Sequence, residues 1–341
     1  MSRKRILLLG GGGTLGSYTA LELLNLDCTV DVVALEKLTS LNRNLTYIQS
    51  PVTDELLRDL FARHHYDGVV DFIHYADPEA YKPRARLLLE NTDHLIFLSS
   101  YRVYAGCETP IVETSPQLLD TVQDEYFQTH EDYAVPKSKN ERFLRSLPQK
   151  NWTIVRPLIS FSHFRLDLVT TGMHHLLAAA EMKQRLMLPQ GARHLAAGVG
   201  WAGNVGKMLA RLVLNPAACG EDYTLGSAEE LTWQDVADCY TDLLGIEFVW
   251  VDDQVYLEQA TPNTYANHCM LYHDRLLNRR IDNRKVLAAT GLSQADLLPL
   301  REALIYELSV IAQRPDRWQR AVENGRPGVE KINAWLQEHQ A

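Results

Sequence analysis

The chain has 341 residues, of which 46% are hydrophobic and 23% are charged, and its formal net charge is −9. This composition is that of a globular protein with one large or two unequal domains, and the acidic balance argues against a nucleic-acid-binding surface. No apolar run approaches the ~20 residues of a membrane span, and the apolar core of the amino-terminal segment is too short for a secretion signal. We therefore expect a cytoplasmic protein with no nucleic-acid and no membrane partner.

Short β-rich runs alternate with helical segments through the first half of the chain. In chain order, we expect strands at residues 5–10, 29–35, 45–50, 67–75, 94–100 and 152–157. We expect helices at residues 17–26, 53–65, 87–95 and 133–147, the second of them capped by Thr53 or Asp54. This alternation is typical of βαβ units, so the predicted fold class is α/β, with a Rossmann-type doubly wound parallel sheet.

After about residue 160 the pattern changes to helical segments separated by polar loops. Residues 169–186 indicate a helix, residues 220–245 a short strand, a turn and a capped helix, and residues 240–341 a mostly helical region. We therefore expect a sheet domain over residues 1–160, to which segments near 195–228 return, and a smaller, mostly helical domain over residues 161–341.

Four consecutive glycines separate the first expected strand from the first helix. Gly11, Gly13 and Gly16 satisfy the spacing G-x-G-x-x-G, whereas Gly10, Gly13 and Gly16 satisfy G-x-x-G-x-x-G. A glycine turn in this place lets backbone N–H groups approach a pyrophosphate at the helix N-terminus, where the helix dipole favours negative charge. The stretch alone predicts a dinucleotide site but leaves both registers open.

An acidic residue follows the second expected strand, where a dinucleotide-binding fold places the carboxylate that binds ribose hydroxyls. Glu36 occupies this position. Because a carboxylate repels a 2′-phosphate, Glu36 favours NAD over NADP, although Lys37 and Arg43 lie close enough in sequence to weaken the preference. We expect NAD as the cofactor, with NADP not excluded.

A second group of residues has the chemistry of proton transfer. Tyr133 and Lys137 are four residues apart, which places both side chains on one face of a helix. An unperturbed tyrosine has a pKa near 10, and a neighbouring ammonium stabilises the phenolate and makes it a useful base. Ser99 and Ser100 end the fifth expected strand, at the edge of the sheet where ligands bind in such folds.

Together these motifs resemble the extended short-chain dehydrogenase/reductase family, also called the NAD-dependent epimerase/dehydratase family. The segments that carry the resemblance are Gly10–Gly16, Glu36, Ser99–Gly106, Thr109–Pro116, Tyr133–Lys137 and Val155–Pro157. They occur in the family's order and cover roughly residues 5–160. With the resemblance, the register Gly10, Gly13 and Gly16 is favoured, the first domain is expected to bind NAD(P), and the second is expected to bind the substrate.

The resemblance also implies roles for individual residues. Ser100, Tyr133 and Lys137 would be catalytic, with Tyr133 as the acid/base and Lys137 holding the nicotinamide ribose. The glycines would hold the pyrophosphate, together with Thr14 and Leu15. Further cofactor contacts are implied for Glu36, Phe72, Ile73, His74, Ser99, Pro157, Leu158 and Ile159.

Several positions depart from the family pattern and indicate a divergent branch. Family dehydratases carry an Asp-Glu pair directly after the catalytic Ser/Thr, and here Tyr101 and Arg102 stand there, which argues against dehydratase chemistry. Ile159 replaces an asparagine that commonly touches substrate. The arginine that grips a nucleotide-sugar pyrophosphate has only a displaced counterpart, Arg193.

No metal site is predicted. The five cysteines are scattered and never form C-x-x-C, which fits a reducing compartment without structural zinc. The pairs His64–His65 and His174–His175 are adjacent in sequence, so on a helix their rings diverge and neither pair chelates well. By resemblance, the helices near residues 87–95 and 133–147 would form a homodimer interface.

The sequence therefore predicts an enzyme, and most specifically an NAD-dependent epimerase acting on a sugar or nucleotide sugar through hydride transfer assisted by Tyr, Lys and Ser. One alternative is an NAD(P)-dependent reductase or dehydrogenase that releases its product. Another is a non-catalytic member of the family that binds the cofactor or RNA.

Overall fold

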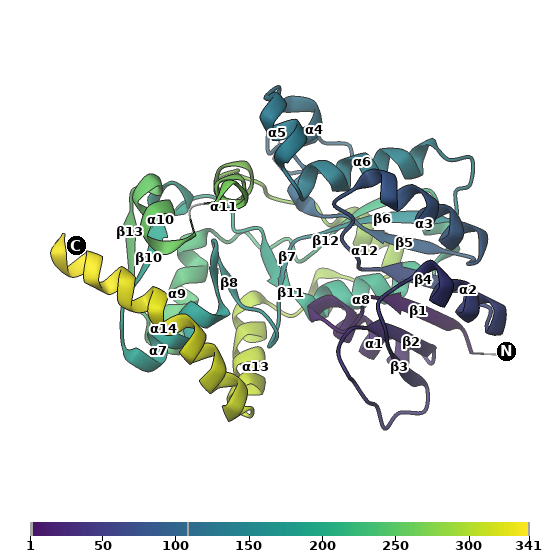
Figure 1. Ribbon diagram of the computed structural model, residues 1–341, viewed down its shortest axis with the longest axis horizontal. Helices are drawn as coiled ribbons and strands as arrows, with labels where there is room; N and C mark the ends of the chain where they lie inside the picture. Colours follow the sequence, from purple (N-terminus) through teal and green to yellow (C-terminus); the bar gives the residue numbers. More distant parts are fainter. Residues whose placement is uncertain (1–2, 108, 263, 340–341) are drawn as a thin grey trace.

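A seven-stranded parallel sheet forms the centre of one of the two lobes (Figure 1). The computed structural model describes residues 3–107, 109–262 and 264–339. The strands lie in the order β12-β6-β5-β4-β1-β2-β3. Their bounds are β1 Arg5–Leu9, β2 Thr29–Ala34, β3 Leu45–Gln49, β4 Gly68–Asp71, β5 Leu95–Leu98, β6 Trp152–Pro157 and β12 Asp222–Leu225.

Helices cover both faces of the sheet, which explains the nearly continuous apolar runs in its strands. Ile6 and Leu8 of β1 pack in one core with α1 (Thr14–Asn25) and α8 (Ala202–Val213). Leu7 and Leu9 pack on the opposite face in a second core. The helices of that face are α2 Asp54–Arg63, α3 Pro78–Glu90 and α6 Ala134–Ser146. The predicted doubly wound α/β sheet is thereby confirmed.

The strand order places a crevice at the middle of the sheet. From β1 the chain runs outward through β2 and β3, then returns to the other side of β1 with β4 and continues through β5 and β6. In such sheets ligands bind beyond the carboxyl ends of the strands, where the order reverses. The loops that follow β1, β4 and β5 meet at this point.

Several predicted boundaries were wrong by a few residues. The first helix begins at Thr14 instead of residue 17, because Gly13 is already its N-cap. The fourth strand ends at Asp71 instead of residue 75. The helix expected at residues 87–95 ends at Glu90, and Thr53, not Asp54, caps α2 by accepting the N–H of Leu56.

The second lobe is mostly helical, as predicted, and has its own apolar core. Its helices are α7 Met173–Met182, α9 Trp233–Leu244, α10 Asp253–Ala260, α11 Tyr265–Met270, α13 Leu300–Ala312 and α14 Pro315–Glu338. It also contains strand pairs that the sequence pattern did not predict. These are β10 Leu186–Pro189 with β13 Phe248–Val251, β7 Ile159–Phe161 with β11 Val199–Trp201, and β8 Asp167–Leu168 with β9 Thr171–Gly172.

Three further helices belong to the connections between the elements described above. The short helices α4 Leu118–Thr121 and α5 Glu125–His130 precede α6, and α12 Arg284–Thr290 packs near β12 and α8. Among the described residues, no helix is long and apolar enough to cross a membrane.

A buried carboxylate joins the second lobe to the helix that carries the glycine loop. Glu307 of α13 accepts hydrogen bonds from the hydroxyl of Tyr18, from Nε1 of Trp201 at 2.5 Å and from the backbone N–H of His163 at 2.6 Å. Burial alone would raise the pKa of Glu307, but the hydrogen bonds from His163, Tyr18 and Trp201 outweigh it and lower the pKa. Glu307 therefore fixes α13 against α1 as an ionised acceptor.

Candidate active site

A cavity of about 300 Å³ opens at the carboxyl ends of the central strands. It is lined by the glycine loop, by the residues that follow β4, β5 and β6, and by side chains from the second lobe. The lining residues are Gly10, Gly13, Thr14, Leu15, Gly16, Phe72, Leu98, Ser99, Ser100, Arg102, Tyr133, Pro157, Leu158, Ile159, Ser160, Arg165, Met270 and Arg275. Most of the residues predicted from the sequence thus surround one space.

Three glycines in the spacing G-x-x-G-x-x-G each have a distinct structural role. Gly10 has φ of +72°, a backbone conformation that favours glycine. A Cβ atom at Gly13 would meet nothing within 4 Å, so the backbone there is open to the cavity. A Cβ at Gly16 would lie 2.3 Å from the backbone of Gly11, so only glycine permits this close packing of helix and loop.

The carboxylate of Glu36 lies against the glycine loop without lining the cavity. A Cβ at Gly12 would be 2.8 Å from its Oε2 atom. The side chain therefore stands at the end of β2 beside the loop that would hold a pyrophosphate, the place from which a carboxylate can reach a ribose.

Tyr133 and Lys137 are held at the beginning of α6. Tyr133 is the N-cap residue and lines the cavity, and the backbone N–H of Lys137 donates to its carbonyl oxygen at 3.2 Å. Pro136 lies in the first turn, where proline costs the helix no hydrogen bond. The buried ammonium of Lys137 lies behind the cavity wall and donates to the carbonyl oxygen of Leu98 at 2.5 Å.

Burial sets the charge state of this lysine. It lowers the pKa of Lys137 to about 8, while the carboxylates of Asp71 and Glu141 act in the opposite direction. Burial likewise raises the pKa of Asp71 to about 6, against hydrogen bonds from the backbone of Ile73 and the hydroxyl of Tyr75. The charged groups of Lys137 and Asp71 are therefore both buried beneath the site and act on each other electrostatically.

Ser100 and His74 flank Tyr133 from different strand ends. Ser100 is buried, lines the cavity and accepts the backbone N–H of Arg102 at 3.2 Å. The ring of His74 lies 5.0 Å from that of Tyr133, and its Nε2 is 2.8 Å from the carbonyl oxygen of Asp132. Burial lowers the pKa of His74, so the ring favours its neutral form.

Three arginines that the sequence analysis did not assign to the site also line the cavity. Arg102 follows Ser100, and its guanidinium carbon lies 4.5 Å from the centre of the Tyr133 ring. Arg165 and Arg275 come from the second lobe. The arginine considered from the sequence, Arg193, instead donates to Gln234 and is not among the lining residues.

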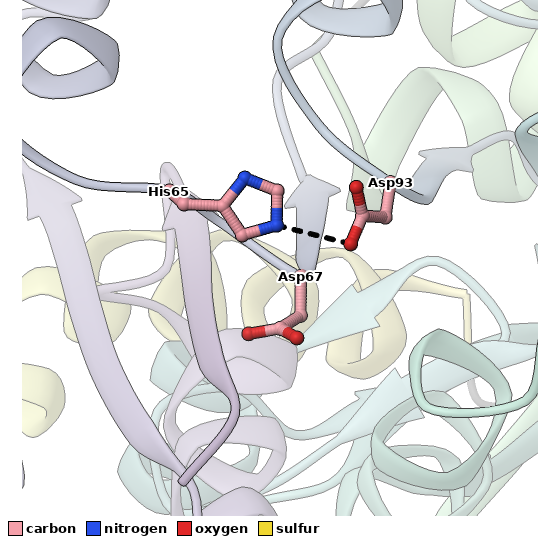
Figure 2. Close-up of side chains that lie close together, drawn as sticks. All are labelled: His65, Asp67 and Asp93. Atoms are coloured by element: carbon pink, nitrogen blue, oxygen red, sulfur yellow. Dashed lines mark hydrogen bonds and ion pairs between the residues drawn. The ribbon is translucent and has the colours of Figure 1, made fainter. Parts of the chain in front are cut away.

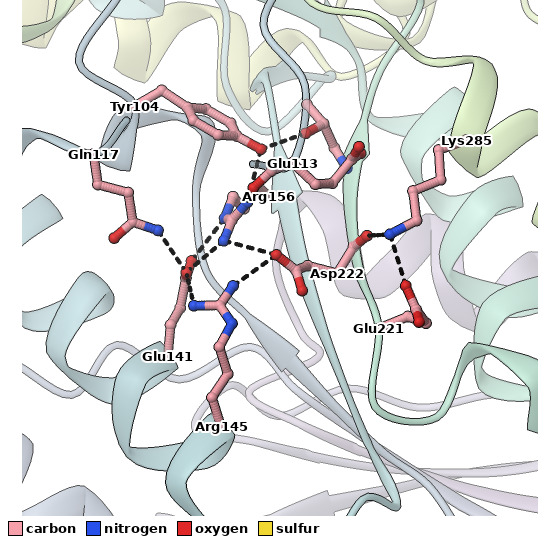
Figure 3. Close-up of polar contacts among 10 residues, drawn as sticks. Tyr104, Glu113, Gln117, Glu141, Arg145, Arg156, Glu221, Asp222 and Lys285 are labelled. Carbon is pink, nitrogen blue, oxygen red and sulfur yellow. Dashed lines mark hydrogen bonds and ion pairs between the residues drawn. The ribbon is translucent and has the colours of Figure 1, made fainter. Parts of the chain in front are cut away.

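An ion network behind the site binds the elements that carry Tyr133, Lys137 and Ser100 to one another (Figure 3). Arg156 of β6 donates to Glu141 of α6 at 2.9 and 2.6 Å and to the hydroxyl of Tyr104 at 2.8 Å. It also contacts Asp222 of β12 at 3.1 Å, and Arg145 binds the same carboxylate at 2.6 Å. The guanidinium of Arg156 and the carboxylate of Glu141 are fully buried.

A small polar cluster lies at the opposite, amino-terminal edge of the sheet (Figure 2). Ligand atoms of His65, Asp67 and Asp93 lie within 4.8 Å of one another, which their distance in sequence did not reveal. His65 bonds Asp93 at 3.0 Å, but both side chains are more than 60% exposed, and Asp67 accepts the backbone N–H of Arg5. This geometry is that of a surface ion pair, and we assign no metal to it.

Solved structures with the same fold show low sequence identity. The epimerase Mth375 from Methanothermobacter thermautotrophicus has a TM-score of 0.71 and 14% identity, with 94% of this chain and 95% of that chain covered. The Bordetella bronchiseptica enzyme WbmG in complex with NAD has a TM-score of 0.67 and 16% identity, covering 92% and 95%. MoeE5 in complex with UDP-glucuronic acid and NAD has a TM-score of 0.64 and 14% identity, covering 93% and 99%.

The family comparison is more specific than these structural similarities. No curated protein sequence matches the chain significantly. The profile of the NAD dependent epimerase/dehydratase family matches residues 6–191, which include the glycine loop and the segment from Ser100 to Lys137. This match confirms the prediction of an NAD-dependent enzyme. The chain belongs to the NAD dependent epimerase/dehydratase family.

Proposed function

We propose that this protein is an epimerase that acts on the sugar of a nucleotide sugar, with NAD held by the glycine loop. The observation that carries the proposal is that Ser100, Tyr133 and the open backbone of Gly13 border one cavity, with the ammonium of Lys137 behind its wall. The similar protein MoeE5 forms a complex with UDP-glucuronic acid and NAD, which supports the substrate class.

The protein's own groups would carry the proton and orient the sugar. Tyr133 takes the proton of the reacting hydroxyl, and Ser100 donates a hydrogen bond to the same oxygen. Lys137, one helical turn after Tyr133, places a buried ammonium behind the cavity wall. When bound, NAD supplies a hydride acceptor for the carbon and a hydride donor for the reverse step.

Cofactor binding would rest on three contacts. Gly13 and the first turn of α1 present backbone N–H groups to the pyrophosphate. Glu36 would hold a ribose, and Pro157 and Ile159 would border the nicotinamide from the end of β6. We also propose that the lobe formed mainly by residues 161–341 supplies the remaining substrate contacts.

Removal of the Tyr133 hydroxyl tests the proposal. We expect Tyr133→Phe to lower kcat by about 100-fold or more, since general acid–base catalysis contributes about 10²–10⁴-fold. The melting temperature should not change, because the structure gives the hydroxyl no hydrogen bond to a described residue. Tyr126→Phe, at an exposed tyrosine of α5, is the matched control. Product formation from nucleotide sugars is followed by NMR.

The same experiment separates the alternatives. Tightly retained NAD that is not consumed supports epimerisation, whereas stoichiometric consumption of free NAD(H) identifies a reductase or dehydrogenase. Full activity of Tyr133→Phe would overturn the catalytic assignment. The absence of turnover in a protein that retains NAD would favour a non-catalytic member of the family.

A further inference from the structure

Arg102 lies where an acidic residue stands in family dehydratases, and it faces the reacting position. Its guanidinium carbon is 4.5 Å from the centre of the Tyr133 ring, and it lines the cavity two residues after Ser100. Within the described part of the chain, Arg102 is the one of the three cavity arginines that contacts this tyrosine. A ligand group bound by Arg102 therefore lies beside the sugar carbon that reacts.

The carboxylates around Arg102 are largely committed to other groups. Asp274 is fully buried and binds three guanidiniums, those of Arg102 at 3.2 Å, Arg275 and Arg279. Glu131 is 3.7 Å from Arg102, but its other oxygen accepts the backbone N–H groups of Tyr133 and Val135 at the start of α6. Of the two carboxylates near Arg102, Asp274 is thus shared with two other arginines and Glu131 with two backbone N–H groups.

The local charges do not balance. Four guanidiniums pair with three carboxylates, so one positive charge is in excess. The guanidiniums are those of Arg102, Arg165, Arg275 and Arg279, and the carboxylates are those of Glu131, Asp167 and Asp274. Among the described residues that line the cavity, three are arginines and none is acidic. An unbalanced charge in a mostly buried cluster is costly unless an anion completes it.

The position of Arg102 selects between the anions that a nucleotide sugar can offer. The diphosphate is attached at the anomeric carbon, whereas a carboxylate on the sugar ring can lie next to the reacting hydroxyl. Arg165 and Arg275, which pair with Asp167 and Asp274, line the same cavity from the second lobe. A planar guanidinium binds a carboxylate through two parallel hydrogen bonds. Resting on the proposed function, we infer that the substrate is a nucleotide-linked uronic acid and that Arg102 binds its carboxylate.

Two ligands that differ only at this carboxylate provide the test. Binding of UDP-glucuronic acid, UDP-glucose and UDP to the purified protein, with its retained cofactor, is measured by calorimetry. We expect UDP-glucuronic acid to bind about 10- to 100-fold more tightly than UDP-glucose, the range expected for hydrogen bonds to a charged group. Arg102→Met should abolish this ratio and leave the affinity for UDP unchanged.

Controls separate recognition from folding and from catalysis. Arg102→Lys should keep part of the preference, and Arg63→Met, at an exposed arginine of α2, should keep all of it. Equal binding of the two sugars, binding of neither, or an equal loss for both in Arg102→Met would overturn the inference. An Arg102-dependent preference without turnover would refute the proposed epimerase but not the carboxylate site.

Discussion

Replacement of Arg156 by methionine should destabilise the protein strongly, because it leaves a charge buried without its main partner. The guanidinium and the carboxylate of Glu141 are both fully buried and share two hydrogen bonds. Removing one member of a buried pair costs about 3–5 kcal/mol. Glu141 keeps contacts with Gln117 at 2.9 Å and Arg145 at 3.3 Å, so we expect a loss near 3 kcal/mol.

The pH dependence of this loss gives the prediction its sharpest form. Burial would raise the pKa of Glu141, but the charge of Arg156 and its hydrogen bonds outweigh this effect and hold the pKa below its usual value. A carboxyl with a lowered pKa stabilises the fold above its unfolded pKa, which is about 4.3 for glutamate, and this contribution is lost as the pH falls through the folded value. The difference between wild type and Arg156→Met should therefore shrink below about pH 4.

Urea denaturation followed by circular dichroism at pH 7 and at acid pH measures both effects. The double variant Arg156→Met/Glu141→Leu is the matched control, since replacing both charges with apolar groups is often nearly neutral. It should regain most of the stability that Arg156→Met loses. A loss below about 1 kcal/mol at pH 7, or a loss that is independent of pH, would refute the reasoning.

Three further predictions concern the glycine loop, the buried lysine and the contact between the lobes. Gly16→Ala should lower the free energy of unfolding by about 3 kcal/mol or more in urea denaturation, because its methyl group would meet the backbone of Gly11. Gly13→Ala should fold normally but bind NAD more weakly in a fluorescence titration. Equal stability of the two variants would contradict this. The pH profile of kcat/KM should fall as the pH rises through about 8, where Lys137 loses its proton, and a profile that is flat to about pH 10 would contradict it. Glu307→Ala removes the partner of the Tyr18 hydroxyl, of Trp201 Nε1 and of the backbone and ring nitrogens of His163, and should lower stability by at least about 2 kcal/mol. Thermal melting measures this loss against Glu307→Gln, which keeps an acceptor oxygen.

The parts of the fold and site that local sequence determines were predictable. The strands of the sheet are apolar runs bounded by turns, and Tyr133 and Lys137 are joined by one helical turn. The three glycines are recognisable by their spacing: Gly10 and Gly16 need glycine for the fold, and Gly13 leaves the backbone open to the cavity. The residues that determine such features lie close together in the chain, so a short stretch of sequence is enough to predict them.

The arginines of the cavity wall were not predictable, for a physical reason. Arg165 lies in an irregular loop and Arg275 in the π-helical turn Leu271–Arg275, and neither has a periodic pattern that marks its direction. They line the same cavity as Arg102 because the second lobe borders it. The strand β13 was not predicted for a similar reason. It is short and pairs with β10, about 60 residues earlier, so the sequence near either strand does not indicate the pairing.

The two ion networks next to the cavity differ in a way that separates structure from recognition. Behind the site, each cation has a carboxylate partner: Arg145, Arg156 and Lys285 pair with Glu141, Asp222 and Glu221. The carboxylate of Glu113 accepts the backbone N–H of Thr224. A network that balances itself needs no ligand, so its role is to hold β6, α6 and β12 together. At the cavity wall, the paired guanidiniums outnumber the carboxylates by one, and the arginine closest to Tyr133 shares its acceptors with others. Since both networks belong to the same fold, the imbalance is a property of the cavity, and the inferred anionic substrate would compensate the excess positive charge.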